Sequence, residues 1–171
     1  MPAPERTVES RIRRITGVRT VRRPLTGRDG AFDLAYTRTP ARGTGTPIVV
    51  LPGGPGMASM LTYSPLRAWA TNQHIDLLMI DHRGVGLSRT DDSGAALTHD
   101  DMLARLVVED VVAVLDAEGI DTAILYGASY GTYVAQAVAA EHPGRVAGLV
   151  LDSPTLGAQD VHDERRAARA T

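Results

Sequence analysis

Residues 120–141 decide the fold and read IDTAILYGASYGTYVAQAVAAE. The segment Ile120–Tyr126 is apolar and predicts a buried strand, and Ser129–Glu141 predicts a helix of small residues. Gly127-Ala128-Ser129-Tyr130-Gly131 lies between them and matches the pattern G-x-S-x-G. Glycines two positions before and after the serine remove side chains that would collide in a sharp turn. This context predicts that Ser129 is a nucleophile, against the simpler interpretation that it only caps the helix.

The chain on both sides of this turn alternates short apolar runs with helical patterns. This order implies right-handed crossovers and an α/β fold, with a mostly parallel sheet flanked by helices. A short helix is predicted at Leu66–Thr71, and Thr98 or Asp100 is predicted to cap a long helix that ends at Gly119. The other predicted strands are Val18–Arg23, Ala31–Thr37, Pro47–Leu51, Ile75–Ile80 and Val146–Leu151.

A loop of prolines and glycines, Leu51-Pro52-Gly53-Gly54-Pro55-Gly56, follows the third predicted strand. A tetrahedral oxyanion needs two backbone N–H donors. We predict that Tyr130 supplies one, because it follows the nucleophile. Gly54 is the predicted second donor, with Gly53 as the next choice. By itself the loop would be read as an ordinary tight turn.

A second glycine-rich loop, Asp81-His82-Arg83-Gly84-Val85-Gly86-Leu87-Ser88, follows the fourth predicted strand. Asp81 and Arg83 are expected to pair and hold the loop. His82 is considered as a catalytic base and rejected, because it precedes the nucleophile in a structural loop. A dinucleotide-binding interpretation of Gly84 to Gly86 is also rejected, because the third glycine of that fingerprint is missing.

These three motifs, in this order and spacing, resemble the prolyl iminopeptidase branch of the α/β-hydrolases. The form Ser129-Tyr130-Gly131-Thr132 is most similar to the tripeptidyl-aminopeptidase-like members of that branch. The resemblance extends from about the second strand to Asp152. It implies a peptidase that releases N-terminal residues, often proline, through an acyl-enzyme.

The resemblance also implies a triad acid and a histidine from later strands, and a cap that recognises the substrate's amino group. We expect these parts to lie outside this chain, which would make it a truncated enzyme. Within the chain, His142 is expected to point away from Ser129, and His162 lies in a polar tail. Asp152 is the best internal acid, although a loop-capping role is the simpler interpretation. Both Asp110 and Asp116 are expected to be solvated.

Composition and charge exclude several kinds of site and partner. The chain has 171 residues, a formal net charge of −2 and no cysteine, which excludes disulfides and thiolate chemistry. We expect no metal, no cofactor, no nucleic-acid partner and no membrane partner, and a cytoplasmic location. The arginine-rich N-terminal region is interpreted as a solvated edge strand or extension. The expected organisation is an extension at 1–16, the hydrolase part at 17–158 and a polar tail at 159–171.

The sequence thus predicts a serine hydrolase, with a peptide or small acyl compound as substrate and an aminopeptidase as the favoured type. Two alternatives stay open: an esterase or other acyl hydrolase on the same fold, and a non-catalytic fragment or remnant. The chain alone is expected to have little activity. It is also expected to fold poorly or to associate, because the apolar strand Val146–Leu151 would leave an open edge.

Overall fold

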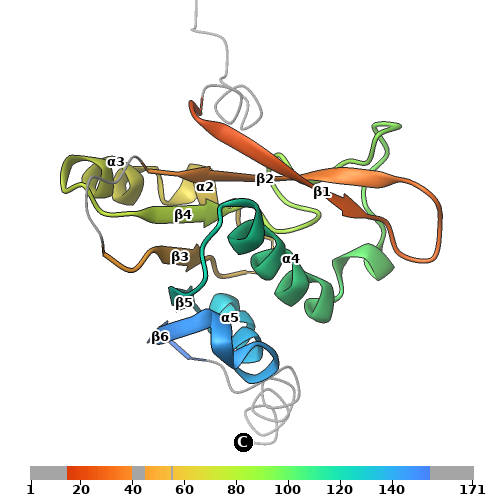
Figure 1. Cartoon of the computed structure of the whole chain (residues 1–171). Coiled ribbons are helices and arrows are strands. Elements are labelled where there is room, and N and C mark those ends of the chain that lie inside the picture. The colour runs from red at the N-terminus through yellow and green to blue at the C-terminus, as the bar shows by residue number, and fades with distance from the viewer. Residues whose placement is uncertain (1–14, 40–44, 55, 155–171) are drawn as a thin grey trace, which may run out of the picture.

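The computed structural model describes residues 15–39, 45–54 and 56–154. One sheet holds six strands in the order β1-β2-β4-β3-β5-β6 (Figure 1). The strands are β1 Val18–Pro24, β2 Ala31–Arg38, β3 Ile48–Leu51, β4 Leu77–Ile80, β5 Ala123–Ala128 and β6 Val146–Asp152. The helices are α2 Ser59–Thr62, α3 Ser64–Asn72, η1 His99–Met102, α4 Ala104–Ala117, α5 Tyr130–Glu141 and η2 Pro143–Arg145. None of the helices in these ranges is long and apolar enough to cross a membrane.

The sheet is mixed, with an antiparallel part and a parallel part. Strand β2 pairs antiparallel with both β1 and β4, whereas β3 pairs parallel with β4 and β5, and β5 pairs parallel with β6. The register places Leu51 opposite Gly127, and Ala128 opposite Asp152. The carboxyl ends of β3, β5 and β6 therefore meet along the same side of the sheet, its carboxyl edge. The predicted α/β architecture is confirmed.

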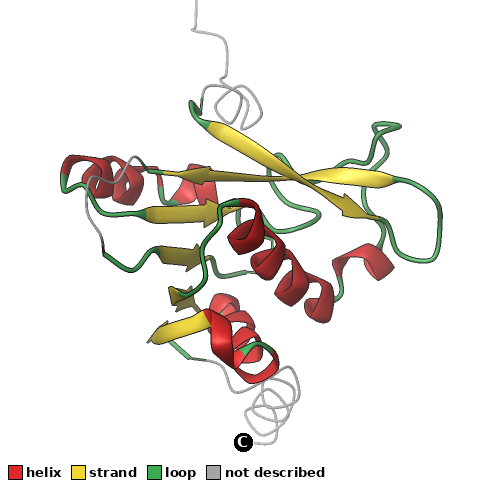
Figure 2. Cartoon of the chain, viewed as in Figure 1, coloured by secondary structure: helices red, strands yellow, loops and turns green. Residues whose placement is uncertain are grey.

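Helices cover both faces of the sheet (Figure 2). On one face, apolar side chains of α4 and α5 pack on the sheet, among them Val111 and Val134, which have no exposed area. On the other face, Met60 of α2 and Ala70 of α3 pack against β3 and β4. Side chains along β5 alternate between buried and half-buried, so one face of this strand is covered more fully than the other.

The helix predicted to start near Thr98 begins later than expected. Thr98 caps the short 3₁₀ helix η1 through a capping box with Asp101, and α4 then begins at Ala104. The main chain at Leu103 is extended, which separates the two helices. The helix α4 buries one apolar face, which includes Val107, Val111, Val114 and Leu115.

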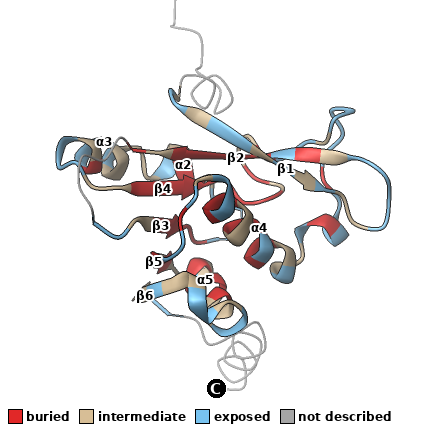
Figure 3. Cartoon of the chain, in the orientation of Figure 1, coloured by how far each residue is buried: buried red, intermediate tan, exposed pale blue. Residues whose placement is uncertain are grey.

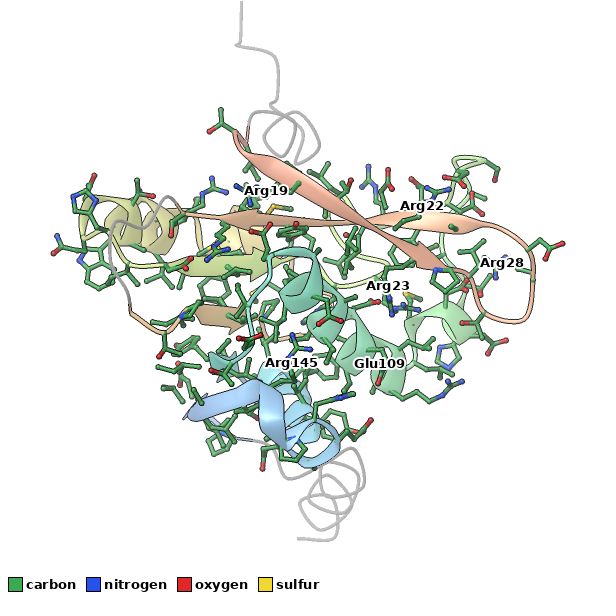
Figure 4. All side chains as sticks on the ribbon, viewed as in Figure 1. Arg19, Arg22, Arg23, Arg28, Glu109 and Arg145 are labelled. Atoms are coloured by element: carbon green, nitrogen blue, oxygen red, sulfur yellow. The ribbon has the colours of Figure 1, made fainter. Side chains whose placement is uncertain are left out.

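Arginines of the β1–β2 hairpin make ion pairs with acids elsewhere in the chain (Figure 4). Arg19 Nη1 lies 2.6 Å from Glu118 Oε2, and Arg28 Nη2 lies 2.7 Å from Asp101 Oδ2. Strand β1 is an edge strand, as expected. The arginines before residue 15 lie outside the described residues.

Strand β6 is the outermost described strand on the side of the sheet opposite β1. Figure 3 shows it as intermediate and exposed, in contrast to the buried strands β3 and β4. Leu149 is 40 % exposed and Val150 is 48 % exposed, and these neighbours point to opposite faces of the sheet. An apolar edge strand of this kind, with a charge only at its last residue, is a template for pairing with another chain.

We predict that the purified chain self-associates through β6. Replacing both Leu149 and Val150 with lysine should shift the chain toward a monomer, because lysine on an edge strand opposes edge-to-edge pairing. Size-exclusion chromatography with light scattering over a range of concentrations measures the effect. Trp69→Lys is the control, since Trp69 is 54 % exposed but lies on α3. A wild-type chain that stays monomeric at every concentration would contradict the prediction.

Candidate active site

Ser129 occupies a strained turn at the carboxyl end of β5. Its backbone has φ 49° and ψ −116°, and it is the N-cap of α5. A side chain other than glycine rarely adopts positive φ, and such strain is concentrated at functional sites. The serine is exposed although its neighbours on β5 are largely covered. Its N–H donates to the carbonyl oxygen of Asp152 at 2.9 Å, which ties the turn to β6.

The two flanking glycines are required by close backbone contacts. A Cβ on Gly131 would stand 2.6 Å from the carbonyl carbon of Leu51, and a Cβ on Gly127 would stand 2.8 Å from the Cα of Thr132. These neighbours are main-chain atoms, so they cannot move aside cheaply. The steric reason for the G-x-S-x-G spacing is therefore confirmed in the structure.

The loop after β3 packs directly against this turn. A Cβ on Gly53 would lie 3.3 Å from the Cβ of Ser129, and Gly53 is buried. The adjacent Gly54 is exposed and has φ 94°, a conformation that favours glycine. The structure thus brings both predicted glycines and Tyr130 to the same edge of the sheet as Ser129.

Asp81 holds the loop after β4, but not through Arg83. Its carboxylate accepts the N–H groups of Met60 at 3.1 Å and Leu87 at 3.2 Å. Burial raises the pKa of the Asp81 carboxyl, while these backbone donors oppose the rise. The predicted pairing of Asp81 with Arg83 is wrong, because the Asp81 carboxylate accepts hydrogen bonds from main-chain N–H groups of α2 and of its own loop instead.

Arg83 instead forms a two-pronged pair with Asp110 of α4. Its Nε and Nη2 atoms donate to the two carboxylate oxygens, each at 2.7 Å, and Arg23 Nε donates to Asp110 Oδ1 at 2.7 Å. The Asp110 side chain has no exposed area. The expectation that Asp110 is solvated is therefore wrong, whereas Asp116, with a side chain 63 % exposed, is solvated as predicted.

His82 is buried next to Tyr130, the residue that follows Ser129. Its ring packs edge-on against Tyr130, with the centroids 6.4 Å apart and the planes at 83°. Neither ring nitrogen has a hydrogen-bond partner among the described residues. Burial lowers the pKa of His82 to about 4, so the ring is neutral near pH 7.

The buried imidazole should make stability depend on pH. Between pH 6.5 and about 4, the unfolded chain binds a proton on His82 that the folded chain does not, so stability falls as the pH is lowered. His82→Leu should remove about 2 kcal/mol of this acid-side loss in the free energy of unfolding between pH 7 and pH 4.5. Urea unfolding at pH 7 and pH 4.5 tests this, with exposed His74→Leu as the control. An equal loss in all three proteins would contradict it.

His142 does not complete the site. His142 lies at the far end of α5 from Ser129, and its Nε2 is 2.9 Å from Glu109 Oε1 (Glu109 is labelled in Figure 4). The prediction that His142 points away is confirmed, while His162 lies outside the described residues. Glu109, Glu141 and His142 hold potential metal-ligand atoms within 4.8 Å of one another. They form an exposed cross-helix cluster remote from the serine.

Asp152 ends β6 beside Ser129. Its Oδ2 accepts the Tyr126 hydroxyl at 3.0 Å, and its Oδ1 accepts the Ser153 hydroxyl at 3.1 Å. The loop that would be capped continues beyond residue 154, outside the described residues, so the loop-capping interpretation stays a prediction. The Tyr126 contact was missed in the sequence, although strand pairing of β5 and β6 could have indicated it.

Comparison with known proteins places this architecture in a family. A sequence profile of the alpha/beta hydrolase fold matches residues 46–170. The chain belongs to the α/β-hydrolase fold family. The three glycine-rich loops that meet at the sheet edge all lie within the matched part.

Among curated proteins, this α/β-hydrolase chain is similar to proline iminopeptidases. It is 35 % identical over 108 residues to the proline iminopeptidase of Neisseria meningitidis serogroup A, which covers 63 % of this chain and 32 % of the relative. It is 30 % identical over 127 residues to that of Heyndrickxia coagulans, covering 73 % and 41 %. The predicted resemblance to the prolyl iminopeptidase branch is confirmed. The chain spans about a third of the length of the Neisseria relative.

Solved structures share the fold at lower identity. A Vigna radiata epoxide hydrolase has a TM-score of 0.64 at 18 % identity, covering 90 % of this chain and 45 % of that one. A thermophilic esterase from Thermogutta terrifontis has a TM-score of 0.61 at 23 % identity, covering 89 % and 53 %. These likenesses establish the α/β-hydrolase fold and say nothing of the substrate.

Proposed function

We propose that this chain carries the nucleophile half of a serine aminopeptidase. Ser129 attacks the carbonyl carbon at the N-terminal residue of a peptide, and an acyl-enzyme forms as the amine leaves. The backbone N–H groups of Gly54 and Tyr130 stabilise the oxyanion. The chemistry uses no metal and no cofactor.

The backbone of Ser129 is the observation that carries the proposal. Its positive φ, its exposure and its place at the start of α5 combine three features that a nucleophile needs. The hydroxyl is presented at the sheet edge, and the positive end of a 12-residue helix favours the negative charge that develops there. An ordinary helix cap would not need the strained backbone, because N-caps normally lie in the β region.

The aminopeptidase assignment is supported by the curated relatives, which are named proline iminopeptidases. Because the chain spans only part of their length, the histidine base and the acid are expected from further chain. A serine hydroxyl without a base is a weak nucleophile at neutral pH. The 171-residue chain by itself should therefore turn over substrate far more slowly than a product that contains the base.

A panel of three chromogenic substrates tests the reaction class. Proline 4-nitroanilide, its N-acetyl derivative and 4-nitrophenyl acetate are incubated with the chain and with any longer product of the same gene. An aminopeptidase should cleave the free-amino anilide in preference to the acetylated one. Cleavage of the ester alone would select an esterase, and no cleavage by the longer product would select a non-catalytic remnant.

A further inference from the structure

The carboxylate of Asp152 is fixed beside the proposed nucleophile. In the β5–β6 pair, Asp152 lies opposite Ala128, one residue before Ser129. The Ser129 N–H donates to the Asp152 carbonyl oxygen at 2.9 Å, so the two residues are held together through the main chain. Figure 1 shows β5 and β6 side by side. The end of β6 therefore lies next to the turn that carries Ser129.

Two hydroxyl groups orient this carboxylate and leave it accessible. Tyr126 donates to Oδ2 at 3.0 Å, and Ser153 donates to Oδ1 at 3.1 Å. Ser153 has φ 54°, which turns the chain sharply after β6. Asp152 is exposed. Since an ionised carboxylate offers about four acceptor positions, two donors leave room for a further one.

Asp81, the carboxylate at the end of β4, shows what a purely structural acid looks like at the same sheet edge. It has no exposed area and accepts main-chain N–H groups that close its loop. Asp152 is exposed, and among the described residues two side-chain hydroxyls donate to its carboxylate. Its exposure leaves the Asp152 carboxylate available to a ligand, which the buried Asp81 carboxylate is not.

The geometry of an N-terminal aminoacyl group matches this position. Its nitrogen is one carbon away from the carbonyl carbon, which corresponds to about 2.5 Å from bond lengths and angles. The attacked carbon lies about 3 Å from the nucleophile oxygen in a reactive complex. An anion that binds this ammonium must lie within a few ångströms of the serine. Adjacent strands are about 4.8 Å apart, so a residue at the end of the neighbouring strand is close enough to supply such an anion.

We propose that Asp152, held by Tyr126, binds the protonated N-terminal amine of the peptide substrate and selects free-amino over blocked peptides. The inference rests on the proposed function, because it takes Ser129 as the point of attack. It assigns a substrate-binding residue within the sheet edge itself, independent of any cap.

Ligand-observed saturation-transfer NMR on the 171-residue chain tests this without requiring turnover, and it tolerates self-association. L-prolinamide and N-acetyl-L-prolinamide are the probes. The wild-type chain should give about threefold stronger saturation transfer to the free amine, as an exposed ion pair allows. Asp152→Asn should abolish this preference, and Tyr126→Phe should reduce it. Asp100→Asn is the matched control, an exposed aspartate on η1, and should retain it.

Equal transfer to both probes, no transfer to either, or a preference that survives in Asp152→Asn would overturn the inference. Tyr126→Phe keeps the test decisive if Asp152→Asn does not fold. Labelling of Ser129 is measured separately. A labelled serine without amine preference would refute only the Asp152 assignment. An amine preference with an unreactive serine in the longer gene product would instead refute the proposed function.

Discussion

Replacing Ser129 with alanine should abolish fluorophosphonate labelling of the product that carries the complete site, and should lower its turnover by about a millionfold. Loss of the nucleophile in a serine protease has an effect of this size, and the remaining rate comes from the oxyanion hole and binding. Intact mass spectrometry of the labelled protein and initial rates on the preferred substrate measure the two effects.

Ser93→Ala is the matched control, because Ser93 is exposed and its hydroxyl bonds Asp91 within its own turn. This variant should be labelled like the wild type. Labelling that persists in Ser129→Ala, or that maps to another serine, would remove the basis of the proposed nucleophile. Circular dichroism of each variant separates a chemical loss from a loss of fold.

Replacing Asp110 with alanine should lower the free energy of unfolding by about 3–5 kcal/mol, the usual cost of leaving a buried charge without its partner. The Arg83 side chain is 1 % exposed, so its guanidinium could not be rehydrated without local opening. Arg23, 20 % exposed, would lose the same partner. The ion pairs that connect β1, the loop after β4 and α4 would be lost together.

Urea unfolding at neutral pH measures this loss, with Asp116→Ala as the control on the same helix. Asp116 pairs with Arg145 at 2.6 Å, but its side chain is 63 % exposed, so its removal should cost less than about 1 kcal/mol. Similar losses in the two variants would show that the buried pair contributes no more than a surface one. If Asp110→Ala does not fold at all, Arg83→Met with Asp110→Leu tests whether an apolar replacement restores the fold.

The sequence by itself determined the architecture and the position of the strained turn at Ser129. Alternating apolar strands and helical patterns are local signals, and they predicted all six strands to within about three residues. The glycines at 127 and 131 marked a close backbone approach that the structure confirms. These features could be predicted because each depends on neighbouring residues and on steric rules of the backbone.

Only the tertiary structure decided how the charged and polar side chains pair. Val107, Val111 and Val114 share one face of the helix, and position 110 lies on the same face. The spacing therefore placed Asp110 on the buried face. A single aspartate is nevertheless expected to be solvated from sequence alone. Its burial becomes favourable only when Arg83 and Arg23 arrive from distant segments. Likewise, Asp152 meets Tyr126 and Ser129 through the register of β5 and β6. Such pairings depend on strand register and on the direction in which a loop side chain points. Both are set by the packing of the whole chain.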